Sequence, residues 1–321
     1  MASIDNKGRI RGTAGSVVYR MYRKKNIVQG KPGKIKQTKG SIRAATEFGL
    51  SSSAAAVIRR AFEPAYIHRD GEAVSRSTRQ VYRSLRNSPT GSAGQRDLHD
   101  AYLQDLEGLD FNGSSKLSEV LQISHRVTRD AEGNLEVTLG RFNPREDVRP
   151  AARAPQRASR YRIRLMVVAF DFRQEYLEYL DIQDLDVQRT EVMEEQTIRL
   201  NAQADPGCMV MLSMSLLLYD ELAHTGEYVL LNNKSFSPCA IIAAYQSTAP
   251  SASTASPLSI SIEAYPDRYR KMREMGYEGN RLLRQLGKLL PKSQNERIRI
   301  VETNATYEDV FRGKKVSFHQ S

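Results

Sequence analysis

Apolar and polar residues alternate near the start of the chain, and a repeat of two residues predicts β-strands. The glycine-rich segment Gly12–Gly15 leads into residues 16–23, where valine, tyrosine and methionine alternate with polar and basic residues. A turn at residues 24–26 and a short run at 27–29 complete a predicted hairpin with one packed face and one solvated face. Residues 32–39 follow as an extended basic tether.

The spacing of apolar residues then changes to that of helices. It predicts one helix from Thr38–Ser41 to Phe62, which Pro64 ends, and a second helix over Glu72–Arg86 with four arginines elsewhere on its surface. A third, shorter helix is predicted over Gln95–Leu106.

From Lys116 onward, apolar residues again recur at every second position. A predicted hairpin pairs residues 121–127 with 135–139 around a turn at 130–134. Further strands are predicted at 161–169, 197–202, 209–219, 228–231 and 240–245. Many short strands divided by turn residues favour an antiparallel sandwich over a parallel α/β sheet.

The last part of the chain is predicted to hold a strand at 258–262, a long helix opened by Pro266 and closed before Pro291, and a final strand pair near 298–301 and 315–318. The predicted fold is α+β and mainly β. Its parts are a basic hairpin and tether (1–40), a helical segment (41–115), a β-sandwich body (116–246), a flexible linker (247–257) and a C-terminal helix-containing extension (258–321). Residues 143–159 are predicted to be an exposed linker within the body.

Charge is distributed very unevenly. Residues 1–60 contain fourteen Lys and Arg against Asp5 and Glu47, a net +12, whereas the whole chain carries +11. Residues 61–321 therefore sum to −1. A cationic arm joined to an almost neutral body predicts an anionic partner, which is nucleic acid, a lipid surface or an acidic protein face.

The basic arm (residues 1–40) is the candidate binding site. Its cationic side chains are Arg9, Arg11, Arg20, Arg23, Lys24, Lys25, Lys31, Lys34, Lys36 and Lys39. They would grip a phosphate backbone or an acidic protein, with salt weakening each phosphate contact; a solvated, weakly ordered terminus is the alternative. Tyr19 and Tyr22 lie between arginines, where they either stack on bases or pack across strands.

A second candidate surface lies in the segment Asp171–Glu195, which holds nine carboxylates and two arginines, a local −7. The candidate acidic partner face comprises Glu175, Glu178, Asp181, Asp184, Asp186, Glu191, Glu194 and Glu195. An arm from one subunit would be steered onto this face of the next, and such head-to-tail contact builds rings or filaments. A solvated acidic loop is the alternative. A calcium site is disfavoured because the EF-hand spacing is missing.

Catalytic and metal signatures are absent from the sequence. Cys208 and Cys239 lie far apart without a nearby histidine, which predicts two buried thiols in paired or adjacent strands. The five histidines have no ligand spacing, and no nucleophile motif or phosphate-binding loop is complete. We therefore expect no enzyme activity, no cofactor and no metal. Without a signal peptide or an apolar span, the expected location is the cytoplasm or a particle.

The opening of the chain resembles that of a known group of proteins. The residues that carry the likeness are 7–20, 26–32, 36–39 and 45–52, the last reading Ala-Thr-Glu-Phe-Gly-Leu-Ser-Ser. They resemble uncharacterised Bacteroidota proteins that begin with a glycine-rich hairpin, a basic segment and a helix. The resemblance covers about residues 7–65 and, more loosely, the strands around 208–245. It implies an immunoglobulin-like β-sandwich and a bacterial or phage-related source, and it transfers no functional residue.

The leading hypothesis is a non-enzymatic structural or assembly subunit. Its arm would engage a neighbouring subunit in a homo-oligomer, a filament or a phage-like particle, either by adding a strand or by charge complementarity. The alternative is a protein that binds the RNA or DNA backbone with the same arm. Peripheral membrane binding through these cations is a third, weaker hypothesis.

Overall fold

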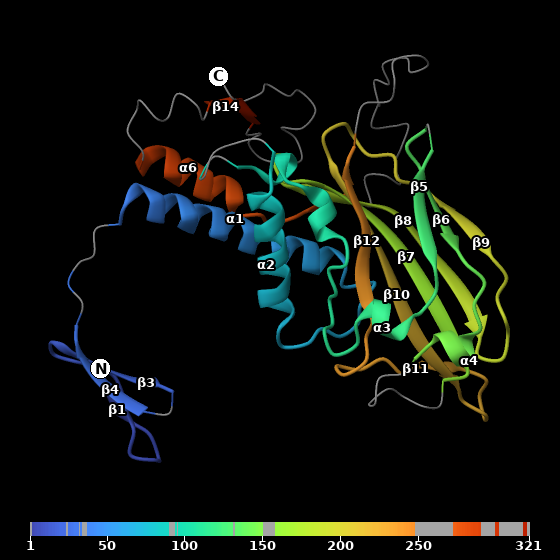
Figure 1. Cartoon of the computed structure of the whole chain (residues 1–321), viewed down its shortest axis with the longest axis horizontal. Coiled ribbons are helices and arrows are strands. Elements are labelled where there is room, and N and C mark those ends of the chain that lie inside the picture. Colours follow the sequence, from blue (N-terminus) through green and yellow to red (C-terminus); the bar gives the residue numbers. More distant parts are fainter. Residues whose placement is uncertain are drawn as a thin grey trace. The chain divides into compact units, whose positions relative to one another are not determined.

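The computed structural model describes residues 2–23, 25–31, 33, 37–89, 94, 96–130, 132–149, 158–247, 272–289, 299–301 and 317–319. The chain divides into two units, Met1–Ile42 and Arg43–Ser321, and each is described by itself. The fold is α+β and mainly β, and its sheets are antiparallel, as the alternation of the sequence predicted (Figure 1).

The N-terminal unit is a four-stranded meander that we call the arm sheet. Its strands are β1 (Ser3–Ile4), β2 (Ile10–Ala14), β3 (Val17–Tyr22) and β4 (Lys25–Gly30), hydrogen-bonded in chain order. The predicted hairpin is confirmed as β3 and β4. Its turn comes earlier than predicted, because Tyr22 pairs with Lys25 and Arg23 takes the left-handed conformation, with φ of 44°.

The larger unit is built on a six-stranded main sheet. Its long strands are β8 (Tyr176–Gln188), β7 (Arg160–Asp171) and β10 (Met209–Glu221), with β7 between the other two. The far side of β10 pairs with β12 (Cys239–Gln246) and β11 (Tyr228–Leu230), and the far side of β8 pairs with β13 (Met272–Glu274). Residues 209–218 of β10 are all buried, so both faces of this strand lie inside the fold.

One face of the main sheet packs against a second, three-stranded sheet of β5 (His125–Arg129), β6 (Leu135–Leu139) and β9 (Gln196–Leu200) (Figure 1). Side chains from both sheets form one core, which includes Val137, Leu165 and Leu212. The two sheets thus enclose a common core, as in a sandwich.

Helices cover the opposite face of the main sheet (Figure 1). They are α1 (Lys39–Ala61), α2 (Ala73–Arg86) and α6 (Gly279–Leu289). The core between them and the sheet includes Ile58, Leu85, Phe170 and Leu283. Alternate residues of one strand point to opposite faces, so β7 supplies Leu165 and Val167 to one core and Met166 and Val168 to the other.

Several sequence predictions agree with the structure. The first two predicted helices are α1 and α2, the predicted hairpin near residue 130 is β5 and β6, and the final strand pair is β14 (Arg299–Val301) and β15 (Ser317–His319). The predicted strand at 258–262 and part of the tether lie outside the described residues.

Other predictions were wrong. The third helix is two short 3₁₀ turns, η1 (Leu98–Asp100) and η2 (Leu103–Leu106). The C-terminal helix starts only at Gly279: residues 272–274 pair with the edge of β8, and Gly276 has φ of 57°, which an α-helix does not accept. The predicted exposed linker at 143–159 begins with a short helix, α4 (Pro144–Asp147), and Val148 after it is buried. One more short helix, α3 (Leu117–Val120), precedes β5.

Candidate interaction surfaces and a buried polar network

The arm sheet has no hydrophobic core of its own. Among residues 2–31 that the structure describes, none is buried. Large apolar side chains on three different strands are instead strongly exposed: Ile4 at 70%, Val28 at 60% and Tyr22 at 53%. A small sheet is normally stabilised by burial of an apolar face, and the described residues of this unit do not bury one.

The two faces of the arm sheet differ in charge. Residues directly opposite on paired strands point to the same face, and Gly12, Tyr19 and Val28 form one such row. We call this the uncharged face, because β3 and β4 place only neutral side chains on it. From these strands it carries Val17, Tyr19, Met21, Asn26 and Val28.

The opposite face, which we call the basic face, is mixed. Its matching row is Thr13, Val18 and Gln29, and Arg20 and Lys25 project from the same side. The sequence predicted one packed and one solvated face. The register gives two different faces, but neither is packed within residues 2–31, and Ile27 lies on the basic face rather than with Val17, Tyr19 and Met21.

The structure places the predicted arm cations at separate points. Arg11, Arg20 and Lys25 lie on strands, Arg9 and Lys31 lie beside strand ends, Arg23 is in the turn, and Lys39 begins α1; Lys24, Lys34 and Lys36 lie outside the described residues. None of the described arm cations forms an ion pair with another described residue. The one acid of the arm, Asp5, is engaged by its own loop: the backbone N–H of Arg9 donates to its carboxylate and lowers its pKa.

The predicted acidic partner face does not form one free acidic surface. Most of its residues belong to β8 and its flanks, because the segment is a strand of the main sheet. Glu178 is buried, and Asn280 donates to Glu175. Asp181 accepts from the backbone N–H groups of Ile182 and Asn201.

Arginines of β7 neutralise two more of these carboxylates. Arg162 contacts Asp186 with both Nε (2.6 Å) and Nη2 (2.9 Å), and Arg164 contacts Asp184 in the same way at 2.7 and 2.8 Å. We call these four residues the Arg–Asp ladder. Hydrogen bonding to Asp186 raises the pKa of Arg162, and Arg162 in turn lowers the pKa of Asp186. Both oxygens of each aspartate already accept from an arginine, so the ladder is a poor site for an added cation such as the arm.

The carboxylates at the end of the predicted acidic face are exposed and lie outside the Arg–Asp ladder. Glu191, Glu194 and Glu195 lie between β8 and β9, and Glu194 pairs with Arg141 at 3.2 Å. The sequence revealed the acidic composition of this segment but not the strand register. The register sets Arg162 and Arg164 opposite aspartates.

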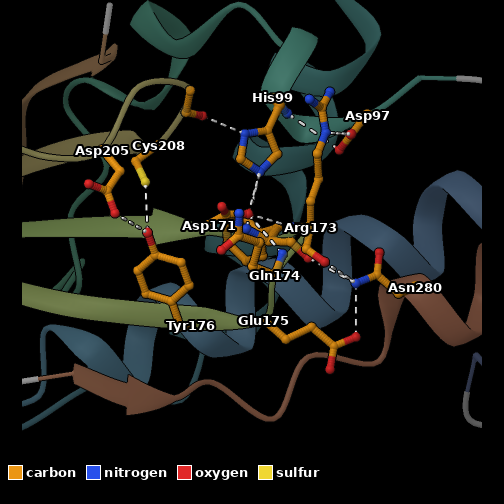
Figure 2. A network of polar contacts seen from close by, with 12 residues as sticks. Asp97, His99, Asp171, Arg173, Gln174, Glu175, Tyr176, Asp205, Cys208 and Asn280 are labelled. Carbon is orange, nitrogen blue, oxygen red and sulfur yellow. Dashed lines mark hydrogen bonds and ion pairs between the residues drawn. The ribbon is translucent and has the colours of Figure 1, made fainter. Parts of the chain in front are cut away.

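A buried polar network lies where the β7–β8 connection meets η1, the residues before β10 and α6 (Figure 2). Asp171 accepts from the backbone N–H groups of Arg173 and Gln174, and Asp97 accepts from Arg173 Nε at 2.8 Å. The amide of Asn280 donates to the carbonyls of Phe172 and Arg173 and to Glu175. The network thus ties four distant segments of the chain together.

His99 stands at the centre of this network, with 3% of its surface exposed (Figure 2). Its Nε2 accepts the backbone N–H of Phe172 at 3.1 Å, so the ring proton lies on Nδ1, which donates to the carbonyl of Gly207 at 2.8 Å. Both ring nitrogens are therefore used in the neutral form. This histidine fastens backbone segments and has no free nitrogen for proton transfer.

The neighbouring side chains of Tyr176 and Cys208 are also poorly suited to act as nucleophiles. Their side chains contact each other at 3.3 Å, and the Tyr176 hydroxyl also donates to Asp205 (Figure 2). Burial raises the pKa of the Cys208 thiol to about 12 and raises the pKa of Tyr176 as well. A thiol with such a pKa stays protonated at neutral pH, so it is a weak nucleophile.

The two cysteines are free and buried, as predicted. Cys208 directly precedes β10 and belongs to the core between the sheets, whereas Cys239 of β12 belongs to the core under the helices. The main sheet separates their side chains. Among the residues that the structure describes, no three His, Cys, Asp or Glu side chains are grouped to hold a metal ion.

Comparison with protein-family models, with curated proteins and with solved structures found no match for this chain. The resemblance of residues 7–65 to Bacteroidota proteins therefore stays a prediction. Among the described helices, none is long and apolar enough to cross a membrane.

Proposed function

We propose that this chain is a non-enzymatic structural subunit whose arm sheet docks on a neighbouring copy, giving a homo-oligomer, a filament or a larger particle. The observation that carries the proposal is the arm sheet without a buried residue, one face of which has only neutral side chains on β3 and β4. The expected setting is the cytoplasm or the particle itself.

The energetics favour docking over solvation of the arm sheet. Full burial of a valine, methionine or similar side chain is worth roughly 1.5–3 kcal/mol relative to full exposure. The uncharged face offers Val17, Tyr19, Met21 and Val28, all of them at least partly exposed. Docking on a second surface would bury these groups together, and a sheet gains stability when its apolar face is covered.

The experiment adds charge to one face at a time. The double variant Tyr19→Asp, Val28→Asp places two carboxylates on the uncharged face, on β3 and β4. Thr13→Asp, Gln29→Asp places two on the basic face, on β2 and β4. We expect the wild type and the second variant to be oligomeric by size-exclusion chromatography with light scattering. The first variant should elute as a monomer, since a buried unpaired carboxylate is costly.

A chain without residues 2–37 shows the oligomeric state of the body in the absence of the arm sheet. This control does not depend on whether the arm sheet of a double variant folds. The shortened chain should be monomeric, as the Tyr19→Asp, Val28→Asp variant should be. An unchanged oligomer in the shortened chain would overturn the proposed function.

Nucleic-acid binding is the second candidate, and Tyr22 favours it. This ring is 53% exposed, lies on the basic face with Arg20, and has the guanidinium carbon of Arg23 at 5.3 Å from its centre. Exposed aromatic rings among arginines are typical platforms for base stacking.

Salt and the two double variants separate the candidates. Phosphate contacts are strongest at low salt, so a gel-shift titration at ~50 mM salt should detect binding if the second candidate is right. Thr13→Asp, Gln29→Asp places its carboxylates on the face of Tyr22 and Arg20, so it should weaken nucleic-acid binding more than Tyr19→Asp, Val28→Asp does. Assembly should show the opposite order, with the larger loss in Tyr19→Asp, Val28→Asp.

A further inference from the structure

One edge of the main sheet ends in a hairpin that the packing of the body leaves open. We call residues Tyr219–Leu230, the end of β10 with β11, the edge hairpin. In the part of the chain that the structure describes, β11 pairs with β10 alone, through three residues. Its outer side is therefore an unpaired strand edge, which is a common attachment point for another β-structure.

The edge hairpin also exposes apolar side chains. Leu222 is 43% exposed, and Tyr228 and Val229 are each 42% exposed. Hydrogen bonds nonetheless hold the loop of the hairpin: the backbone N–H of Leu222 donates to the carbonyl of Glu227, and the N–H of Gly226 donates to the carbonyl of Leu222. The guanidinium carbon of Arg160 lies 4.2 Å from the centre of the Tyr228 ring. Val229, opposite Asp220, and Tyr228, opposite Glu221, point to opposite faces of the hairpin, so exposed apolar side chains are present on both faces.

The charge of the edge hairpin is opposite to that of the arm. Residues 219–230 contain Asp220, Glu221 and Glu227 but no lysine or arginine. Glu221 accepts from the Tyr228 hydroxyl at 3.3 Å, and Asp220 and Glu227 have no cation within ion-pair distance among the described residues. By contrast, Arg162 and Arg164 already satisfy Asp186 and Asp184 of the sequence-predicted acidic face.

We propose that the edge hairpin of one copy is the surface on which the arm sheet of a second copy docks. This rests on the proposed function and names the partner surface for it. The uncharged face of the arm sheet would cover the apolar side chain of Val229, which lies beside Asp220 on one face of the hairpin. The net positive charge of the arm would attract Asp220 and Glu227 at longer range. Apolar contact supplies affinity, and the opposite charges supply orientation and rate.

A charge swap within the full chain tests the pairing. Asp220→Lys, Glu227→Lys should weaken assembly at least tenfold at ~50 mM salt, measured by dilution with light scattering, because like charges then oppose each other. Adding Arg20→Glu, Lys25→Glu to the same chain makes the charges of arm and hairpin opposite again. Because Arg20 and Lys25 lie on the face of the arm sheet opposite the docking face, they act at longer range, so the rescue should be partial and largest at low salt. The matched control Glu191→Lys, Glu195→Lys makes the same charge change at exposed carboxylates elsewhere and should assemble like the wild type.

The outcomes separate this inference from the proposed function. Normal assembly of Asp220→Lys, Glu227→Lys, with a monomeric Tyr19→Asp, Val28→Asp variant, would overturn the edge hairpin as the acceptor and leave the assembly role standing. Loss of assembly without rescue by Arg20→Glu, Lys25→Glu would also overturn it. Normal assembly of the Tyr19→Asp, Val28→Asp variant would instead contradict the proposed function.

Photo-crosslinking gives a direct second readout that does not depend on the charge variants. A benzophenone amino acid at Leu222 in the full chain should crosslink to residues 2–31. Mixing copies labelled with ¹⁵N and unlabelled copies shows whether the crosslink joins two chains. Crosslinks within one chain, or to segments other than the arm sheet, would overturn the inference.

Discussion

The arm sheet and the main sheet share the alternation of side chains along their strands but differ in how many of those side chains are buried. Both consist of antiparallel strands in which alternate residues point to opposite faces. In β10 of the main sheet, residues 209–218 are all buried between a second sheet and a helical layer. In β3 of the arm sheet, no residue is buried. The alternation of a strand therefore fixes which side chains share a face, whereas burial depends on what covers that face.

The charged residues of the two sheets show the same contrast. Arg162 and Arg164 of the main sheet each hold an aspartate with two hydrogen bonds. Arg11 and Arg20 of the arm sheet are exposed and form no ion pair with the described residues. These two main-sheet arginines are thus engaged within the fold, whereas the two arm-sheet arginines have no such partner among the described residues.

Removing one aromatic ring from each sheet should produce the largest difference between them. Phe170 is fully buried beside Phe62 and Phe172, so Phe170→Ala should lower the free energy of unfolding of the body by about 3–5 kcal/mol. Tyr19→Ala on the arm sheet should change it by less than about 0.5 kcal/mol. Hydrogen exchange of peptides from β7 and β10 measures both effects in the body alone.

Size-exclusion chromatography of the same two variants completes the test. Tyr19→Ala should weaken assembly, while Phe170→Ala should not do so at temperatures where it stays folded. A clear loss of protection in β7 and β10 on Tyr19→Ala would show that the arm sheet stabilises the body, and the contrast between the sheets would fail.

The sequence predicted most long elements of both sheets, because their patterns are local. Alternation located β7, and apolar spacing located α1 and α2 to within a residue or two. The acidic segment was misread because nothing local reveals that Asp184 and Asp186 face Arg164 and Arg162 across a register. The role of His99 was equally hidden, since its partners Phe172 and Gly207 are 73 and 108 residues away.

We expect the next largest loss of unfolding free energy from a change at the centre of the buried polar network. In His99→Phe, the N–H of Phe172 and the carbonyl of Gly207 lose their partners inside the fold, at about 1–3 kcal/mol for each group. Urea unfolding followed by circular dichroism should show a total loss of at least about 2 kcal/mol. His99→Asn keeps a donor near Nδ1 and His99→Gln an acceptor near Nε2, so each should lose less. A neutral His99→Phe would mean that the network contributes no net stability.

The smallest expected effect on the free energy of unfolding comes from replacing an arginine that forms an ion pair, compared with one that forms none among the described residues. Arg164 contacts Asp184 twice and also donates to the carbonyl of Pro64 at 2.8 Å, yet the pair is partly exposed, so Arg164→Met should cost only about 1 kcal/mol of unfolding free energy. Arg20→Met in the arm sheet should cost the body nothing measurable. A double-mutant cycle with Asp184→Asn, run in low salt and again in ~1 M salt, isolates the pair energy, which screening should reduce. Equal costs for Arg164→Met and Arg20→Met would mean that the two sheets do not differ in how they hold their charges.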